Sequence, residues 1–596
     1  MLRKEVKTED KWDLTKYFKN EAEYDAMYQE TLELIKQIVS RKGTLTASAT
    51  SLYEYLELDT KLSLNIETLY VYSYLYHYSD TTDEYGKILK DKADKLDEKI
   101  STETSFVRSE LLSVSYEYIK ELIKQDKRLE HYAFELEKMF RYENHTLSEA
   151  EERIISLATN AFGGTHESYS ALDNADAKFG TIEVDGEEIE LTHSNFIKLI
   201  GSKDRSLREK VFNQYYEFFK SHYNTITEMY KGHVKEDIFL STVRKFSSPL
   251  EMSLYSDNID TSVYQNLIET IHMNLSPLHD YMKLRADYLK LDDPHMYDIY
   301  VDLVEGETRK FTFDEAKDII LNAVKPLGEK YVTDLSQAFE NRWIDKYPND
   351  GKRSGAYQWG TYGIDPYVSV NFEGTEDSVS TLAHELGHAM HSYYSDTTQE
   401  YTYAGYPIFL AEIASTVNEV LLNEYMIKNA QDDSEKLLYI TSFLDKFRAT
   451  VYRQTQFAEF ESIAHDMEMK GEPLTPESLA KVYYDINKLY YGDNVKTDDL
   501  IKYEWARIPH FYTSFYVYKY ATGFCAALAI ASDILSGKKG AQERYLEFLS
   551  SGGSKYPLDT LAACGVDMTS SEPITKGIKM FEDKLHLAQN IIEKVK

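Results

Sequence analysis

The residues with the clearest chemical potential are two histidines and a glutamate in one short segment. His384 and His388 are four positions apart, and Glu385 directly follows the first histidine. Residues four apart share one face of an α-helix, so both imidazoles are directed at the same point, and Glu385 can reach a water molecule there. Zinc favours imidazole nitrogen, and its catalytic sites keep one position open. This spacing therefore predicts a zinc site with a carboxylate beside it.

A catalytic zinc ion needs a third protein ligand. His391 is the nearest candidate, but it lies a further turn along the same helix and does not converge easily with the other two histidines. Glu412 follows Pro407 in an apolar segment that is typical of a second helix, where an unpaired carboxylate is costly and a metal ion would satisfy it. Glu419, two turns later, could hold an imidazole of the first helix. The alternatives are a buried helix of hydrogen-bonded histidines and a salt-bridged carboxylate at Glu412.

The elements that must position these residues are a capped helix and a short strand before it. Thr375 can cap the helix that carries the two histidines, and Glu376 and Asp377 in its first turn suit the helix dipole. Residues 366–372 alternate with period two, which predicts a strand. This strand is either an edge to which a substrate backbone adds, or a strand that only extends the sheet.

The rest of the chain is predicted to be mostly helical. Apolar residues recur at helical spacing over residues 21–174, 194–341 and from 376 onward. A β-hairpin interrupts this pattern around Asp185-Gly186, a dipeptide typical of two-residue hairpin turns. The predicted fold class is therefore mainly α, with a small β-sheet beside the helix that carries the histidines.

At 596 residues the chain is too long for a single hydrophobic core, so several subdomains are expected. We divide the chain into an N-terminal helical region, residues 1–195, that ends in the hairpin, and a catalytic domain, residues 196–596. The sequence gives no indication of an oligomeric state.

The net charge and the number of cysteines limit which classes of partner and which cellular compartment are expected. The formal charge is 67 − 100 = −33, and so acidic a surface repels nucleic acid and anionic lipid, so neither is expected as a partner. The two cysteines, Cys525 and Cys564, suit a reducing compartment, although they could form one bridge. The N-terminus has no apolar signal segment, and the longest apolar run, Tyr520 to Ser532, is too short to span a bilayer. We therefore expect a cytoplasmic protein.

Three segments resemble motifs of the zinc oligopeptidase family that includes oligoendopeptidase F and thimet oligopeptidase. They are HELGHAMH at 384–391, FLAEIASTVNE at 409–419 and IPHFYTSFYVYKYATG at 508–523, and the likeness is clear over residues 357–567. The resemblance implies one zinc ion held by His384, His388 and Glu412. Glu385 would then be the general base. The resemblance also implies a mostly helical body around a deep substrate channel, and short unstructured peptides as substrates.

A second group of polar side chains lies in the last of these segments. His510 is followed by Tyr512, Tyr516 and Tyr520, which recur every fourth residue and share one face if the segment is helical. Phenol or imidazole donors stabilise the negative charge that builds up on the carbonyl oxygen in peptide hydrolysis. The resemblance implies this role for His510, Tyr512 and Tyr520, with Tyr516 as a further candidate, but the glycine-rich loop of thimet oligopeptidase has no counterpart here. The alternative, in a chain with 50 tyrosines, is an aromatic packing stripe.

The function predicted from these observations is that of a zinc-dependent metalloendopeptidase that hydrolyses internal bonds of short oligopeptides. A metal-activated water attacks the peptide carbonyl, and Glu385 takes up the proton of this water. The alternatives are a zinc carboxypeptidase with the same helix motif and a non-catalytic helical protein that binds peptides. Retention of Glu385 speaks against the second alternative, because a binding protein has no need of that base. The residues alone do not separate zinc from cobalt or manganese.

Overall fold

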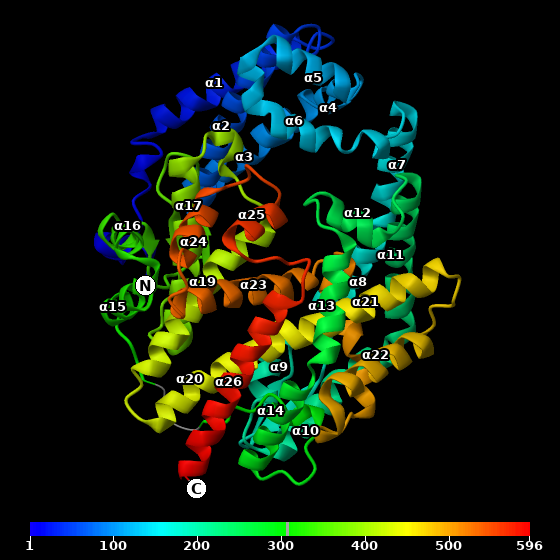
Figure 1. Ribbon diagram of the computed structural model, residues 1–596, viewed down its shortest axis with the longest axis vertical. Helices are drawn as coiled ribbons and strands as arrows, with labels where there is room; N and C mark the ends of the chain where they lie inside the picture. The colour runs from blue at the N-terminus through cyan, green and yellow to red at the C-terminus, as the bar shows by residue number, and fades with distance from the viewer. Residues whose placement is uncertain (305–308, 596) are drawn as a thin grey trace. The chain divides into compact units, whose positions relative to one another are not determined.

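The computed structural model describes residues 1–304 and 309–595, and helices make up most of them (Figure 1). The chain forms two compact units, each built from three separate segments. Unit 1 comprises Met1–Thr146, Thr308–Tyr425 and Ile530–Gly565, and unit 2 comprises Leu147–Glu307, Met426–Ala529 and Val566–Lys596. The mainly helical fold class is confirmed, whereas the division at residue 195 and the deep channel stay predictions.

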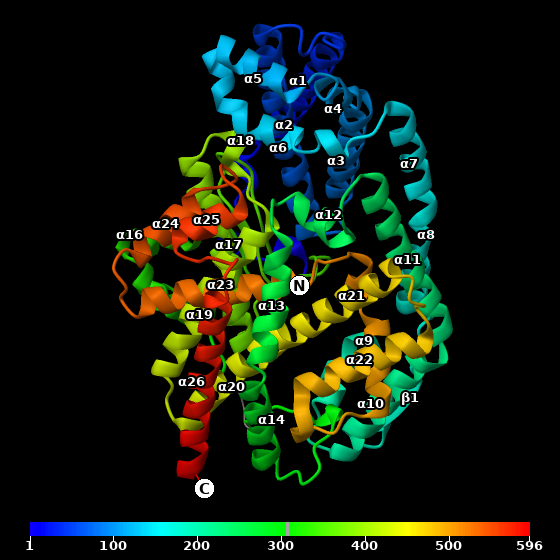
Figure 2. The same ribbon diagram turned by 45° about the vertical axis from the view of Figure 1, so that its right-hand side comes forward.

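The first segment of unit 1 is a group of helices that includes the long helix α2. These helices are α1 (Glu21–Ser40), α2 (Ala49–Ser79), α3 (Glu84–Glu103), α4 (Phe106–Leu111), α5 (Tyr116–Gln125) and α6 (Ala133–Phe140). Short 3-10 helices lie at η1 (Arg3–Glu5), η2 (Thr8–Asp10), η3 (Leu14–Lys16), η4 (Lys127–Tyr132) and η5 (Glu143–His145). Asn20, Ser48 and Asp83 cap α1, α2 and α3 by accepting backbone N–H groups. Helices α1 and α3 both pack against α2 (Figure 2).

The other two segments of unit 1 supply the helices around the predicted metal site. They are α15 (Phe313–Ala323), α16 (Glu329–Glu340), α17 (Glu376–Thr398), α18 (Tyr401–Ala404), α19 (Ile408–Lys428), α24 (Ala541–Ser550) and α25 (Pro557–Cys564), with the 3-10 helix η8 (Lys325–Leu327). The predicted cap of α17 is confirmed, because Thr375 Oγ1 accepts the backbone N–H of Ser378 at 3.1 Å. Helix α17 packs against α16 and α24.

Three short strands form a small sheet beside α17. They are β3 (Ile344–Asp345), β4 (Tyr357–Trp359) and β5 (Tyr367–Ser369), in the order β3-β5-β4. Strand β5 confirms the strand predicted within residues 366–372, and it runs parallel to β3 and antiparallel to β4. Because β5 is the central strand, it is not an edge, and the idea that a substrate backbone adds to it is wrong. The edge strand that contacts α17 is β4, which the sequence pattern did not predict.

A buried ion pair ties this sheet to the start of the chain. Asp345 is fully buried, and its carboxylate pairs with Arg3 and with Lys352, whose Nζ lies 2.8 Å from Oδ1. Lys352 also donates to the carbonyl oxygen of Val370 at 2.7 Å. A buried carboxylate is stable only when its charge is matched in this way, so the contact holds β3 and the end of β5 together.

In the part that the structure describes, unit 2 consists of helices, one β-hairpin and the connections between them. Its helices are α7 (Glu149–Phe162), α8 (Gly164–Ala171), α9 (His193–Ile200), α10 (Arg205–Ser221), α11 (Tyr223–Val243), α12 (Pro249–Tyr255), α13 (Thr261–Met273), α14 (Ser276–Leu289), α20 (Asp433–Phe447), α21 (Arg453–Met469), α22 (Pro476–Tyr491), α23 (Tyr518–Leu535) and α26 (Glu572–Val595). Two π-helical turns, η6 (Leu172–Asp176) and η9 (Arg448–Tyr452), and the 3-10 helices η7 (Met296–Asp298), η10 (Gly492–Asn494), η11 (Asp499–Arg507) and η12 (Pro509–Tyr512) complete it. Residues 305–308, inside the predicted helical stretch 194–341, lie outside the described residues.

The predicted hairpin is confirmed. Strand β1 (Thr181–Val184) pairs antiparallel with β2 (Glu187–Glu190). Asp185 and Gly186 have φ angles of 53° and 87°, the left-handed values that a two-residue type I′ turn requires. Glycine adopts such φ values without steric cost, which explains why the dipeptide Asp185-Gly186 predicted the hairpin turn correctly.

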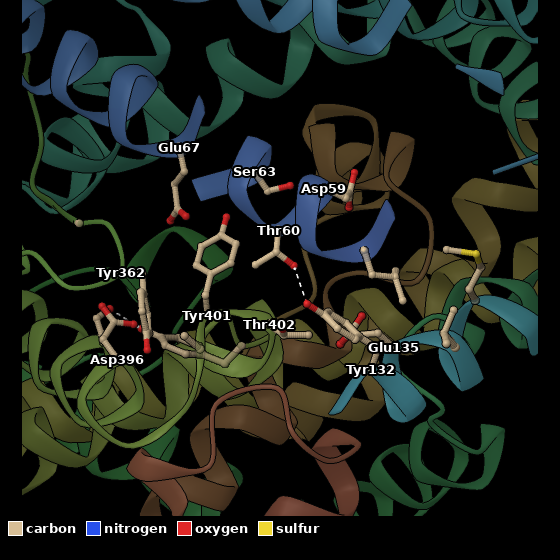
Figure 3. Close-up of a pocket in the computed structure, with 18 of the residues that line it drawn as sticks. Asp59, Thr60, Ser63, Glu67, Tyr132, Glu135, Tyr362, Asp396, Tyr401 and Thr402 are labelled. Atoms are coloured by element: carbon tan, nitrogen blue, oxygen red, sulfur yellow. Dashed lines mark hydrogen bonds between the residues drawn. The ribbon is translucent and has the colours of Figure 1, made fainter. Parts of the chain in front are cut away.

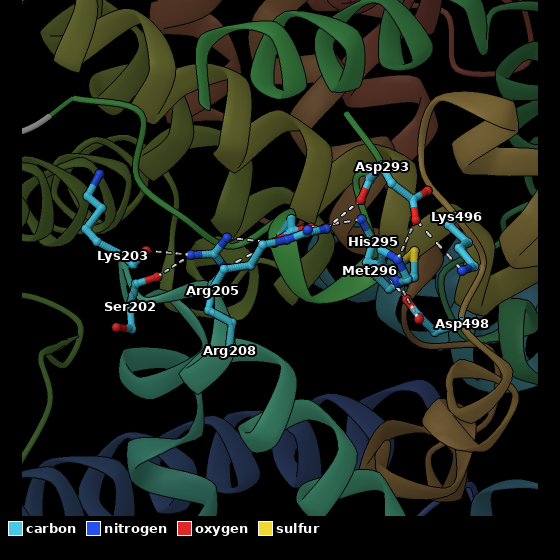
Figure 4. A network of polar contacts seen from close by, with 10 residues as sticks. Ser202, Lys203, Arg205, Arg208, Asp293, His295, Met296, Lys496 and Asp498 are labelled. Carbon is cyan, nitrogen blue, oxygen red and sulfur yellow. Dashed lines mark hydrogen bonds and ion pairs between the residues drawn. The ribbon is translucent and has the colours of Figure 1, made fainter. Parts of the chain in front are cut away.

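Arginine side chains anchor the start of α10 to the loops of unit 2 (Figure 4). Asp298 is 3% exposed and accepts hydrogen bonds from Arg208 Nη2 at 2.7 Å and Arg205 Nη2 at 3.0 Å. In the neighbouring loop, His295 Nδ1 lies 2.7 Å from Oδ1 of Asp498. Charge-assisted hydrogen bonds of this kind satisfy a buried carboxylate without a metal ion, so this network stabilises the unit.

Two predictions from the sequence concern membrane-spanning helices and the two cysteines. Among residues 1–304 and 309–595, no helix combines the length and the apolar character needed to cross a membrane. Cys525 and Cys564 are free thiols, and both are buried. The bridge considered between them is therefore not formed.

The two helices that carry the predicted ligands meet backbone to backbone at Gly387. A Cβ atom on this residue would lie 2.6 Å from Cα of Ser415 and 2.9 Å from the carbonyl oxygen of Ala414. No side chain fits into that space. Helices α17 and α19 can therefore approach this closely only because residue 387 is glycine.

We predict that Gly387→Ala pushes α17 and α19 apart and lowers the free energy of unfolding by about 2–4 kcal/mol, because two backbones must shift. Urea titrations measure this change. Gly164→Ala is the control, because a Cβ there would meet nothing within 4 Å. Unchanged stability of the Gly387 variant would show that the two helices are not in close contact.

Candidate metal centre

Three side chains from α17 and α19 bring potential ligand atoms together. The Nε2 atoms of His384 and His388 are 3.1 Å apart, and Oε2 of Glu412 lies 3.6 Å and 3.9 Å from them. Within the described residues, this is the only set of three or more His, Cys, Asp or Glu ligand atoms close enough to hold one metal ion. A tetrahedron with zinc–ligand bonds of about 2.1 Å has edges of about 3.4 Å. The three atoms therefore fit a zinc ion.

The two imidazoles are held in states that suit metal binding. Burial lowers the pKa of His388 to about 3, and the neighbouring His384 acts in the same direction. His388 is therefore neutral near pH 7, with a lone pair available for a metal. Nδ1 of His384 lies 2.5 Å from Oε1 of Glu419, which confirms that Glu419 holds an imidazole of the first helix. This contact orients the ring so that Nε2 faces the candidate ligand atoms of His388 and Glu412.

Glu385 is buried beside the ligand atoms. It is 7% exposed, and burial raises the pKa of its carboxyl to about 7. The charge of His384 and a hydrogen bond with the backbone of Gln358 lower this pKa, whereas the charge of Glu412 raises it. The carboxyl therefore exchanges its proton near neutral pH, as a general base must. Gln358 belongs to the edge strand β4, so β4 touches Glu385 directly.

Asn418 and Tyr331 hold α19 in place, and the sequence analysis did not single them out. Asn418 is fully buried, its amide donates to the carbonyl oxygen of Ala383 at 3.3 Å, and its Oδ1 accepts from Tyr331 at 2.9 Å. Ser415 Oγ lies 3.4 Å from Oε2 of Glu412. A polar residue inside an otherwise apolar segment was the signal that could have indicated Asn418.

His391 does not take part in this group. It is fully buried, and its ring stacks on Tyr406 with centroids 3.6 Å apart and planes at 12°. Within the described residues, it is not among the ligand atoms that converge. This agrees with the expectation that a third histidine on the same helix lies too far along the helix.

In unit 2 the structure brings His510, Tyr516 and Tyr520 together. The Tyr520 hydroxyl lies 3.3 Å from Nε2 of His510, and the rings of Tyr516 and Tyr520 are 5.4 Å apart. The segment is not one continuous helix, because η12 ends at Tyr512 and α23 begins at Tyr518. The assumption that three tyrosines share one helical face is therefore wrong.

Tyr512 lies in a different aromatic cluster of unit 2. It is 7% exposed, and its ring stacks on Tyr169 at 4.4 Å and lies 6.2 Å from Tyr230. Its hydroxyl has no hydrogen-bond partner within the described part of the chain, and burial raises its pKa. These contacts favour the packing alternative for Tyr512.

The backbone between the two clusters turns at Phe515. This residue has φ 59° and is 2% exposed, and a residue with a side chain rarely adopts such a left-handed φ. Next to it, Ser514 Oγ lies 2.9 Å from Nε2 of His233 and donates to Asp237 at 2.5 Å. Buried contacts, rather than glycine, therefore fix the bend before Tyr516 and Tyr520. The sequence analysis did not indicate His233 or Asp237.

Known proteins match this chain along its whole length. Residues 198–580 match Peptidase family M3, and residues 110–179 match Oligopeptidase F. Oligopeptidase PepF of Bacillus subtilis is 42% identical, over 100% of this chain and 89% of the relative. Group B oligopeptidase PepB of Streptococcus agalactiae is 38% identical, over 99% of this chain and 98% of the relative. A crystal structure of oligoendopeptidase-F from Enterococcus faecium is 34% identical, has a TM-score of 0.74, and covers 96% of this chain and 99% of that chain.

The raised pKa of Glu385 makes the stability of the metal-free protein depend on pH. A carboxyl that binds its proton more tightly in the folded chain stabilises the fold below its unfolded pKa of 4.5, and this contribution is lost as the pH rises through about 7. We expect metal-free Glu385→Gln, which cannot ionise, to exceed the parent in stability by up to about 3 kcal/mol at pH 8. Urea titrations with chelator should find the difference vanishing near pH 4.5. A difference that is the same at both pH values would contradict this explanation.

Proposed function

Since the chain belongs to peptidase family M3, we propose that it is a zinc-dependent metalloendopeptidase that hydrolyses internal bonds of short, unstructured peptides. Membership of the family makes the chain a metallopeptidase that acts on oligopeptides. The zinc assignment depends on one observation, the convergence of His384, His388 and Glu412 within reach of a single ion.

The ligand set favours zinc over harder divalent ions. Two imidazole nitrogens and one carboxylate oxygen are typical of catalytic zinc, whereas calcium and magnesium favour oxygen ligands alone. When bound, zinc supplies a Lewis acid that polarises the peptide carbonyl and makes water a better nucleophile. The contact of Glu419 with His384 supports the assignment, because histidine ligands of zinc are commonly oriented by a carboxylate.

Glu385 is the proposed general base. It directly follows the first ligand on α17, and its burial keeps its proton affinity in the neutral range. It accepts the proton of the attacking water and passes this proton to the leaving nitrogen, which therefore departs as an amine. With a cation held by His384, His388 and Glu412, the pKa of this carboxyl would fall, so Glu385 would be ionised at neutral pH.

His510 and Tyr520 are proposed to stabilise the oxyanion of the tetrahedral intermediate. Their support is the resemblance of the segment to peptidase motifs and the contact between the two side chains. Tyr516 packs beside both rings and is the further candidate. Tyr512, which the resemblance also implies, has less support because it is packed among other aromatic rings.

The alternatives have weaker support. A carboxypeptidase would remove single C-terminal residues, whereas several relatives are named oligoendopeptidases. A non-catalytic binding protein would gain nothing from a buried, ionisable Glu385 beside the ligands. The free thiols Cys525 and Cys564 favour a cytoplasmic location, and the charge of −33 favours peptides over nucleic acid or membranes as partners.

Glu385→Gln should retain zinc and lose at least about 10³-fold in kcat, because the substitution removes the base and no ligand. Fluorogenic peptide hydrolysis and metal analysis of the same sample test both parts. Asp377→Asn, an exposed residue in the first turn of α17, is the matched control and should keep full activity. Residual activity above a few per cent in the Glu385 variant would refute the assignment of the base.

Tyr520→Phe and His510→Ala should each lower kcat by about 10²-fold with a smaller change in KM, because an oxyanion donor acts mainly in the transition state. Tyr512→Phe is expected to change kcat far less, since its hydroxyl has no partner in the described chain. Steady-state kinetics on one internally quenched peptide compares the three variants. A larger loss for Tyr512→Phe than for Tyr520→Phe would reverse the assignment.

A further inference from the structure

We propose that a cavity in unit 1, next to the metal centre, binds a positively charged group of the peptide substrate, an ammonium or a guanidinium. The inference rests on the proposed peptidase function and adds a substrate class to it. The cavity has a volume of about 660 Å³ (Figure 3). Its walls come from α2, from η4 and α6, from β4, and from the segment between the end of α17 and Tyr406.

The cavity begins one helical turn beyond the second metal ligand. Ser392 and Asp396 line it, and they lie one and two turns after His388 on the same face of α17. Gln358 of the edge strand β4 connects the two sites. Its backbone is hydrogen-bonded to Glu385, and its side chain lines the cavity and accepts a hydrogen bond from Ser392 at 3.4 Å. A peptide laid along β4 from the metal centre therefore reaches this cavity.

The charge of the lining is entirely negative. Four carboxylates line the cavity, and no Lys, Arg or His does; they are Asp59, Glu67, Glu135 and Asp396. Of these four carboxylates, only that of Glu135 forms an ion pair within the described residues, and its partner is Lys138. Burial raises the pKa of Asp59 and Glu67, although hydrogen bonds with Tyr55 and Tyr401 act in the opposite direction; burial and the charge of Glu67 raise the pKa of Asp396 to about 7. A cationic ligand would supply the missing partner.

Aromatic rings complete the lining, and they suit an organic cation. They are Tyr55, Tyr132, Tyr362, Tyr401, Tyr406 and Trp359. The faces of such rings attract ammonium and guanidinium groups. Figure 3 shows the hydroxyl of Tyr401 directed at the carboxylate of Glu67, with Asp59 and Asp396 on opposite sides of the space. Charge and aromatic surface therefore surround one volume.

The arrangement does not suit a second metal ion. Within the described residues, the only ligand atoms that converge closely enough for a metal are those of His384, His388 and Glu412. The carboxylates of the cavity are spread over its walls, whereas calcium and magnesium need several oxygens around one point. A side chain or a peptide terminus fills such a volume better.

The geometry also predicts where the charge lies in the substrate. Asp396 is eight residues beyond His388, which corresponds to about 12 Å along the helix. An extended peptide advances about 3.3 Å per residue, so the charged group should lie about three to four residues from the bond that is cleaved.

The test measures peptide binding to the zinc-loaded, full-length Glu385→Gln protein by fluorescence anisotropy. The probes are eight-residue peptides with a C-terminal fluorophore and an acetylated N-terminus, with one Lys moved along the sequence and norleucine as its neutral match. Non-acetylated peptides separate the N-terminal ammonium from the side chain. We expect about tenfold tighter binding for the charge at its favoured position. The preference should fall as salt is added.

The variant pair Asp59→Asn with Glu67→Gln should abolish the preference for the charged peptide, with the neutral peptide as the internal reference. Asp396→Asn alone should reduce it, which keeps the test valid if the pair does not fold. Glu54→Gln is the matched control, because this exposed residue of α2 does not line the cavity, and it should keep the preference.

The outcomes separate this inference from the proposed function. No preference for charge at any position, or a preference that survives all the cavity variants, overturns the cation site. Cleavage of neutral peptides by the parent protein supports the peptidase function in either case. If the parent cleaves no peptide, the proposed function fails, while the binding measurements still decide on the cavity.

Discussion

The contact between α17 and α19 is the constraint on which the metal centre depends. Gly387 lets the two backbones meet, with space for no side chain between them. Because of this contact, Glu412 faces the imidazoles of His384 and His388 across 3.6–3.9 Å. Asn418 and Glu419 reinforce it, since each joins the two helices through a buried or partly buried hydrogen bond. The helices therefore hold the three side chains around one point, and such preorganisation lowers the entropic cost of binding an ion.

Burial gives the site its chemical character. The same low-dielectric surroundings that lower the pKa of His388 to about 3 raise that of Glu385 to about 7. His388 is therefore neutral at pH 7, whereas Glu385 exchanges its proton near that pH. A divalent ion at the neighbouring side chains would favour the carboxylate form of Glu385 in this buried site, where a base is effective. Further along α17, Asp396 faces a cavity that also has Asp59 and Glu67 of α2 in its lining, and within the described residues none of these three carboxylates has an ion pair.

Local sequence signals predicted those parts of the structure that depend on neighbouring residues. The spacing of His384 and His388 and the cap at Thr375 belong to one helix, and Asp185-Gly186 dictates its own turn. Glu412 and Glu419 could be proposed because they share one face of a second predicted helix, in a segment that resembles the peptidase motifs. The helices, the cap and the turn needed no knowledge of distant contacts, and the structure has them as predicted.

The parts that could not be predicted depend on tertiary contacts. Strand β4 was missed because the alternation that predicted β5 extends over residues 366–372 and β4 lies outside it. The central position of β5 follows from its pairing with segments on both sides. The segment from His510 to Tyr520 has helical spacing, but buried contacts of Ser514 force a bend at Phe515. Nothing in the sequence around Gln358 indicated its hydrogen bond with Glu385, because this contact exists only where β4 lies beside α17.

The central claim is that one zinc ion lies between α17 and α19, and zinc K-edge X-ray absorption on the purified, active protein tests it most directly. The claim predicts one zinc per chain with two imidazole nitrogens at about 2.0–2.1 Å and carboxylate oxygen completing the protein ligands. Sulfur ligands in the spectrum, or full activity in protein that contains no metal, would contradict it.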